Sequence, residues 1–234
     1  MPQLPITIAE TVCIAGPVCR SKADIVLALD QSSSIVQQEW GGMVNWETEV
    51  LGFARRLAGA FPIHATQTQV GVLKFNQTAE IVFNLNRYGD GPSLVNAIGN
   101  IPIWGGDTNI AIALRTARDM FTQSHGSRSD VHKILILVTD GTANLEELNT
   151  IPEARRTKEA GIKIYTVGIT HQVDQDQLSD IASRPDYFFY AANFGQLNRV
   201  LQDLIAQSCP GMERSVLLAC RCLLNRLVAK EDIK

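Results

Sequence analysis

Five oxygen-bearing side chains occur at three places in the sequence where they could share one metal ion. They are Asp30, Ser32 and Ser34 in the segment DQSSS, Thr108 in GGDT and Asp140 in VTDG. This set of two carboxylates and three hydroxyls suits a hard cation, Mg²⁺, Mn²⁺ or Ca²⁺, and not zinc, which prefers histidine and cysteine. Two carboxylates balance a divalent charge, and neutral hydroxyls leave the ion able to accept a carboxylate from a partner.

The spacing of the first three residues supports a shared site. If residues 30–34 are extended, Asp30, Ser32 and Ser34 point to the same side, because alternate residues of an extended chain do so. The alternative is that Asp30 and Ser32 only cap the loop and the helix that follows. Capping does not explain why Thr108 and Asp140 arrive at the same edge of the domain.

Buried strands must position these loops. Residues 23–30 and 133–141 are nearly continuous apolar runs that end in an acid, which is typical of strands buried on both faces of a parallel sheet. Four more strand-like runs occur at 69–75, 79–83, 162–169 and 187–191. Helical patterns occupy most of the intervals, with long helices expected before Pro62 and at about 108–122, and others at 92–99, 150–161, 173–182 and 194–208.

The alternation of strands and helices predicts an α/β fold. We expect a doubly wound, mostly parallel sheet with one antiparallel edge strand and helices on both faces. Ligands of such sheets bind beyond the carboxyl ends of the strands, where the five residues fall.

Composition excludes several classes of function. The formal net charge is -3, so attraction to nucleic acid or anionic lipid is not expected. No apolar run is long enough to span a membrane. The N-terminus lacks a basic leader, so it does not read as a signal peptide, and either the chain is a piece of a longer protein or its true start is missing.

The motifs LALDQSSSI, GGDTN and ILVTDG resemble those of the von Willebrand factor type A domain, also called the integrin I-like domain. The segment YFFYAANFGQLNRVLQDLIAQSC is similar to the end of its extracellular matrix members. The resemblance covers about residues 19–209. It implies a Rossmann-like fold carrying a metal-ion-dependent adhesion site (MIDAS).

In such a site Ser32, Ser34 and Thr108 would touch the ion directly, and Asp30 and Asp140 would do so directly or through water. The resemblance implies a secreted, extracellular module that binds collagen or another matrix glycoprotein through an acidic residue of that partner. Many members carry a second threonine two residues after the metal threonine, where this chain has Ile110, so outer support of the site is less complete here.

The chain divides into a flank at 1–20, a domain at 21–209 and a tail at 210–234 to which no function is assigned. All five cysteines lie near the ends, at positions 13, 19, 209, 220 and 222. This distribution suggests a disulfide between Cys19 and Cys209, as in an oxidising compartment, although scattered free thiols are the alternative. The odd count leaves at least one thiol free or paired with another chain.

Two further residues have an open interpretation. Asn76 begins the sequon Asn-Gln-Thr in an expected exposed hairpin turn, which either carries a glycan or is a plain polar turn. Trp104 precedes the GGDT loop, and can either pack against the domain or offer an apolar contact to a partner.

The sequence disfavours three alternatives to an extracellular adhesion module. A magnesium-dependent aspartyl phosphotransferase needs a second acid two residues after its nucleophile, where this chain has Ser32, and no suitable catalytic lysine, phosphate loop or Ser-His-Asp set occurs. The chain is therefore not expected to be an enzyme. A structural matrix module with a vestigial site is disfavoured because all five positions are filled, and an intracellular member because of the border cysteines and the sequon.

Overall fold

The computed structural model describes residues 22–36 and 45–208. Six strands form one sheet in the order β3-β2-β1-β4-β5-β6. They are β1 Ala23–Asp30, β2 Thr68–Phe75, β3 Ala79–Phe83, β4 His132–Thr139, β5 Ile162–Ile169 and β6 Phe188–Ala191. Neighbouring strands are parallel except for β2 and β3, which pair antiparallel. The predicted fold class is thereby confirmed.

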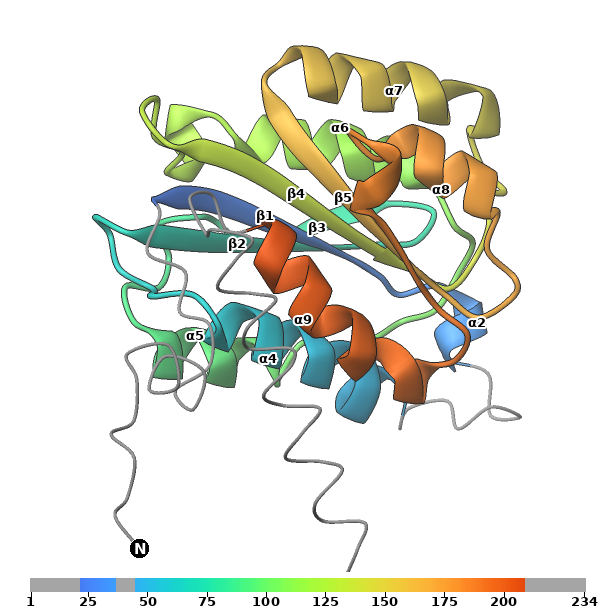
Figure 1. The fold of residues 1–234 in the computed structure, drawn as a ribbon, viewed down its shortest axis with the longest axis horizontal. Helices are drawn as coiled ribbons and strands as arrows, with labels where there is room; N and C mark the ends of the chain where they lie inside the picture. Colours follow the sequence, from blue (N-terminus) through green and yellow to red (C-terminus); the bar gives the residue numbers. More distant parts are fainter. Residues whose placement is uncertain (1–21, 37–44, 209–234) are drawn as a thin grey trace, which may run out of the picture.

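Helices cover both faces of the sheet (Figure 1). One face packs against α4 (Leu51–Gly59), α5 (Gly91–Ile98) and α9 (Leu197–Ser208), and the other against α6 (Ile110–Met120), α7 (Glu147–Glu159) and α8 (Gln175–Ile181). Shorter turns are α2 (Ser33–Val36), the π-helix η2 (Asn45–Val50) and the 3-10 segments η3 (Gln123–His125), η4 (Pro185–Tyr187) and η5 (Phe194–Gln196).

The apolar run of β1 reflects this sandwich of three layers. Ile25, Leu27 and Leu29 belong to the core cluster on the α4 and α9 side, whereas Val26 and Ala28 belong to the cluster on the α6 side. Because successive strand residues point to opposite faces and both faces are covered, the interior positions from Ile25 to Leu29 are all apolar.

The strand order places the candidate residues at the centre of one edge. The connections run outward in opposite directions from β1 and β4, and crevices at such a switch point are where open α/β sheets bind ligands. Leu29 is in register with Val138, so Asp30 at the end of β1 lies beside the end of β4.

Some expected boundaries differ from the structure. The helix expected from residue 150 begins at Glu147, so Pro152 lies inside it and not in its first turn. The helix expected from residue 108 begins at Ile110, because the Asn109 side chain caps it by accepting a hydrogen bond from the Ile112 N–H. Thr108 is therefore a loop residue.

Some sequence-based expectations concern residues outside 22–36 and 45–208. They are the disulfide between Cys19 and Cys209, the pairing of the other cysteines, the flank at 1–20 and the tail at 210–234.

A buried ion pair closes the opposite, amino edge of the sheet. Asp24 at the start of β1 is fully buried, and its Oδ1 accepts hydrogen bonds from Arg128 Nη2 at 2.7 Å and Nε at 2.9 Å. The same guanidinium donates to the carbonyl oxygens of Ala23, Ala65 and Gln67. One planar group with several fixed donors therefore joins the chain before β2 and β4 to the start of β1.

We expect Arg128→Ala to reduce the free energy of unfolding by about 3 kcal/mol, the low end for breaking a buried pair, because Arg128 is partly exposed. Arg128→Lys should also destabilise the fold, because an ammonium cannot reproduce the planar fork. Urea unfolding in EDTA measures both.

The matched control is Arg184→Ala, which removes an exposed bidentate pair with Asp186. Its effect should be much smaller. Equal losses for the Arg128 and Arg184 variants would contradict the structural role assigned to Asp24.

Candidate metal centre

Asp30 is a buried carboxylate held in one orientation. Its Oδ1 accepts the backbone N–H of Ser32 at 2.8 Å, and its Oδ2 accepts the hydroxyl of Thr139 at 2.5 Å. The first bond turns the chain immediately after β1, and the second ties the side chain to the end of β4. Asp30 thus combines the capping role considered from the sequence with a fixed position at the edge of the sheet.

Ser32, Ser34 and Asp140 form a continuous chain of oxygen atoms. Ser32 Oγ lies 3.0 Å from Ser34 Oγ, and Ser34 Oγ donates to Asp140 Oδ1 at 2.7 Å. The expectation that residues 30–34 are extended is wrong, because α2 begins at Ser33. The two hydroxyls meet nevertheless, since Ser32 precedes the helical turn and Ser34 lies within it.

Thr108 reaches the same place from the loop before α6. Its hydroxyl and that of Ser34 would lie 3.4 and 3.8 Å from a Cβ built on Gly141, so both oxygens border the start of the loop after β4. The Thr108 N–H donates to Asn144 Oδ1 at 2.8 Å, and its carbonyl accepts from Asn144 N at 3.0 Å. These bonds fix Thr108 to the loop that carries Asp140.

The backbone conformation and close side-chain neighbours explain Gly106, the second of the two glycines before Thr108. Gly106 has φ +120°, and a Cβ there would lie 1.9 Å from Gln77 Oε1. Gly106 also exchanges two 2.8 Å hydrogen bonds with Ser33, one to its carbonyl and one from its N–H. Glycine is required here both by the left-handed backbone and by the contact with its neighbours.

The oxygen spacing fits a small divalent cation. Ligands at about 2.1 Å in an octahedron are separated by about 3.0 Å along each edge. The separations of 3.0 Å between Ser32 and Ser34 and 2.7 Å between Ser34 and Asp140 are close to this value. No group of three or more His, Cys, Asp or Glu side chains that could hold a metal occurs among the described residues, so a site here must rely on hydroxyls.

These two aspartates differ from the other buried acids in having no basic partner. Asp24 is paired with Arg128, and Glu153 with Arg118, Arg156 and Arg115. Within residues 22–36 and 45–208, neither Asp30 nor Asp140 has an ion pair, and their side chains accept hydrogen bonds from hydroxyl and N–H groups. A buried carboxylate without a neighbouring positive charge is costly, so this pair of aspartates is suited to hold a cation.

Both carboxyl groups respond to this environment. Burial raises the pKa of Asp30 from 3.8 to about 6, against the effect of its hydrogen bonds from Thr139 and Ser32. Burial and the charge of Asp30 raise the pKa of Asp140 from 3.8 to about 7. A divalent cation between them would remove the repulsion and keep both groups ionised.

Outer residues that the sequence did not reveal hold the loop of Asp140. Thr170 has the unusual φ of 70° for a β-branched residue, and its hydroxyl donates to the Asp140 carbonyl at 3.3 Å. The Thr142 hydroxyl donates to the Gln172 carbonyl, and Gln172 N–H donates back to Thr170 Oγ1. A non-glycine residue at positive φ has no signature in a single sequence, since only the packing of the two loops imposes it.

The expectation of an exposed turn is confirmed for Gln77 and Thr78 but is wrong for Asn76 itself. Asn76 is buried, and its Nδ2, the atom that would carry a glycan, donates to the Gly105 carbonyl at 2.6 Å. Its Oδ1 accepts from the N–H and the hydroxyl of Thr78. In the folded domain the Asn-Gln-Thr segment therefore serves as a turn that supports the metal loop.

The raised pKa values predict how the metal-free domain depends on pH. A group whose pKa is higher in the folded than in the unfolded state stabilises the fold at low pH, and this contribution is lost as pH rises through the folded value. In EDTA, Asp140→Asn should therefore raise the melting temperature at pH 8 by at least about 3 °C, the response of a domain of this size to about 1 kcal/mol. The gain should shrink at pH 5, where the wild-type carboxyls hold protons.

Thermal unfolding at both pH values checks this prediction. Asp130→Asn, at an exposed acid of the opposite edge, is the control and should show no such difference. A gain that is the same at pH 5 and pH 8 would contradict the proposed repulsion.

Comparison with known proteins agrees with this geometry. The family model described as "von Willebrand factor type A domain" matches residues 24–206. Collagen alpha-1(XII) chain of Notophthalmus viridescens is 32% identical over 193 residues, covering 81% of this chain and 20% of the collagen chain. Mouse matrilin-3 is 32% identical over 190 residues, covering 78% of this chain and 37% of matrilin-3. The chain thus spans only a minor part of these relatives.

Solved structures show the same architecture. Proximal thread matrix protein 1 from the mussel byssus, in a structure with a zinc-occupied MIDAS motif, has a TM-score of 0.77 and 27% sequence identity. The match covers 82% of this chain and 49% of that one. From its sequence, its six-stranded sheet and its match over residues 24–206, the chain belongs to the von Willebrand factor type A domain family.

Proposed function

We propose that this chain is a metal-ion-dependent adhesion module, spanning residues 21–209, of an extracellular matrix or secreted protein. Ser32, Ser34 and Thr108 bind one divalent cation directly, and Asp30 and Asp140 bind it directly or through water. The cation then accepts an acidic side chain of a protein partner.

The observation that carries this proposal is the pairing of Asp30 and Asp140 without a basic side chain. Their raised pKa values and the chain of oxygens from Ser32 to Asp140 favour a small cation at this place. Mg²⁺, Mn²⁺ and Ca²⁺ all prefer oxygen ligands, as this set provides. Zinc, disfavoured from the ligand types alone, belongs in the test because a related MIDAS motif holds it.

A cation held in this way supports binding rather than catalysis. The proposed ligands are side chains anchored at the edge of the sheet, and the sequence has Ser32 where an aspartyl phosphotransferase needs its second acid. The relatives are collagen chains and matrilin, which supports a matrix partner such as collagen or another matrix glycoprotein.

We also propose an extracellular location, on the basis of the same relatives. Among the described residues, no helix has both the length and the apolar character needed to cross a bilayer. The relatives are matrix collagens and matrilin-3.

The proposal predicts metal-dependent binding to matrix proteins. Wild-type protein should bind at least one immobilised collagen or matrix glycoprotein when Mg²⁺, Mn²⁺ or Zn²⁺ is supplied, and lose this binding in EDTA. Asp30→Ala should lower the cation affinity, measured by calorimetry, by more than the roughly 10–100-fold typical of changes to groups outside the ligand shell.

The matched control is Asp130→Ala, which removes an exposed acid from the opposite edge and should bind like the wild type. Binding that persists in EDTA and in Asp30→Ala would overturn the proposal. Retained fold without cation binding would indicate a vestigial site, and release of phosphate from model esters would indicate an enzyme.

A further inference from the structure

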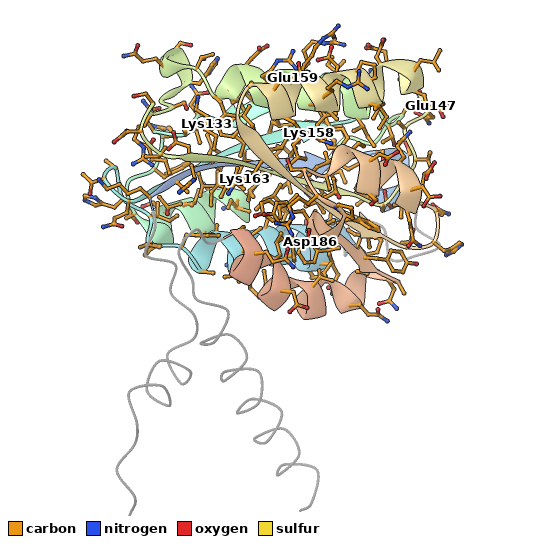
Figure 2. All side chains as sticks on the ribbon, turned by 45° about the horizontal axis from the view of Figure 1, so that its top comes forward. Lys133, Glu147, Lys158, Glu159, Lys163 and Asp186 are labelled. Atoms are coloured by element: carbon orange, nitrogen blue, oxygen red, sulfur yellow. The ribbon has the colours of Figure 1, made fainter. Side chains whose placement is uncertain are left out.

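Exposed apolar side chains gather at the edge of the sheet that carries the metal centre. Among the described residues, Trp104 and Leu148 are the large hydrophobic side chains with high exposure, at 73% and 92%. Trp104 lies four residues before Thr108, and Leu148 lies in the first turn of α7, just after the loop of Asp140. Figure 2 shows the adjacent Glu147 at this end of α7, away from Lys133 and Lys163, which belong to the starts of β4 and β5.

Neighbouring residues hold the Trp104 side chain in a solvent-exposed position. The ammonium group of the buried Lys74 lies 5.6 Å from the centre of the indole ring. Lys74 is itself fixed by the Pro102 carbonyl at 3.2 Å and by Glu80 at 3.3 Å. The ring therefore rests on a positioned cation and leaves most of its surface open.

The chain on the other side of Trp104 is equally constrained. The Gly105 carbonyl accepts from Asn76, and Gly106 is bonded twice to Ser33, next to the metal residues. The segment that follows Trp104 is thus tied by direct hydrogen bonds to Ser33, which stands between Ser32 and Ser34. A rigid aromatic side chain loses little conformational entropy when it is covered, which is why tryptophan is frequent among the dominant residues of protein interfaces.

We propose that Trp104 and the metal centre form one docking surface for a protein segment in which apolar side chains flank an acidic residue. This inference rests on the proposed function and specifies its partner. The acid binds the cation, and a neighbouring apolar side chain covers the indole ring. Leu148 provides a second apolar contact on the opposite side of the edge.

The charge of the loop argues that these flanking side chains are apolar rather than acidic. Asp107 is exposed between Trp104 and Thr108, and the exposed Glu147 precedes Leu148, whereas the charge of Glu146 is offset by Arg115. A second acid in the partner would meet these carboxylates, whereas an apolar side chain would gain by leaving water. The surface thus selects a single acid with apolar neighbours.

The test uses immobilised synthetic peptides of one length, with a central Glu flanked either by Phe and Leu or by Ser. In Mg²⁺ the wild type should bind the apolar-flanked peptide at least about tenfold more tightly than the Ser-flanked peptide. This is the size of effect expected when a tryptophan that contributes strongly to binding is covered. Trp104→Ala should lose this preference, and Trp104→Phe should keep most of it. Calorimetry with Mg²⁺ alone should give the same cation affinity for all three proteins.

The outcomes separate this inference from the proposed function. Loss of all peptide binding in Asp30→Ala with an unchanged preference in Trp104→Ala would overturn the inference alone. Equal binding of both peptides, or no binding of either by a wild type that still binds Mg²⁺, would also overturn it. If the wild type does not bind Mg²⁺, this result would instead contradict the proposed function.

Leu148→Ala serves as a second variant on the other side of the edge. It should weaken binding of the apolar-flanked peptide while leaving cation affinity unchanged, because Leu148 belongs to α7 and not to the loops that carry the five oxygen donors. If Leu148→Ala binds like the wild type and Trp104→Ala does not, the apolar contact is confined to Trp104, and the claim for Leu148 fails.

Discussion

Two buried carboxyl groups without a basic partner dominate the physical chemistry of this domain. Asp24 and Glu153, the other buried acids of the described residues, are neutralised by arginines. Asp30 and Asp140 accept hydrogen bonds only from hydroxyl and N–H groups of the described residues. Burial raises the pKa of both carboxyl groups, and the charge of Asp30 raises that of Asp140 further. Two buried carboxyl groups with raised pKa values are typical of a site at which a bound cation supplies the balancing positive charge.

The sheet makes this arrangement possible by joining residues that are far apart in sequence. Asp30 and Asp140 are brought together because β1 and β4 are adjacent and parallel, so that both strands deliver their last residues to one edge. Apolar layers on both faces then prevent either strand from shifting, because a slip of one residue would reverse every buried side chain. The position of the oxygens therefore depends on the whole core rather than on local loops.

Around the oxygens, the loops support one another through hydrogen bonds rather than through regular structure. Asn144 holds Thr108, Ser33 holds Gly106, and Thr170 holds the carbonyl of Asp140. These bonds support the site although position 110 holds an isoleucine, which begins α6 and is buried in the core. The same rigid loops keep Trp104 exposed beside the site, which relates partner selection to the geometry that holds the cation.

The sequence by itself determined the fold class, the strands and the identity of the five oxygen-bearing residues. These features follow from local patterns, because apolar runs that end in an acid and the spacing of DQSSS are visible without knowing any contact. Only the tertiary structure decided that Asn76 is buried under Gly105, that Arg128 neutralises Asp24, that Ser34 lies in a helical turn and that Trp104 faces water. Each of these depends on which distant segments pack together, and a single sequence carries no signal for such long-range contacts.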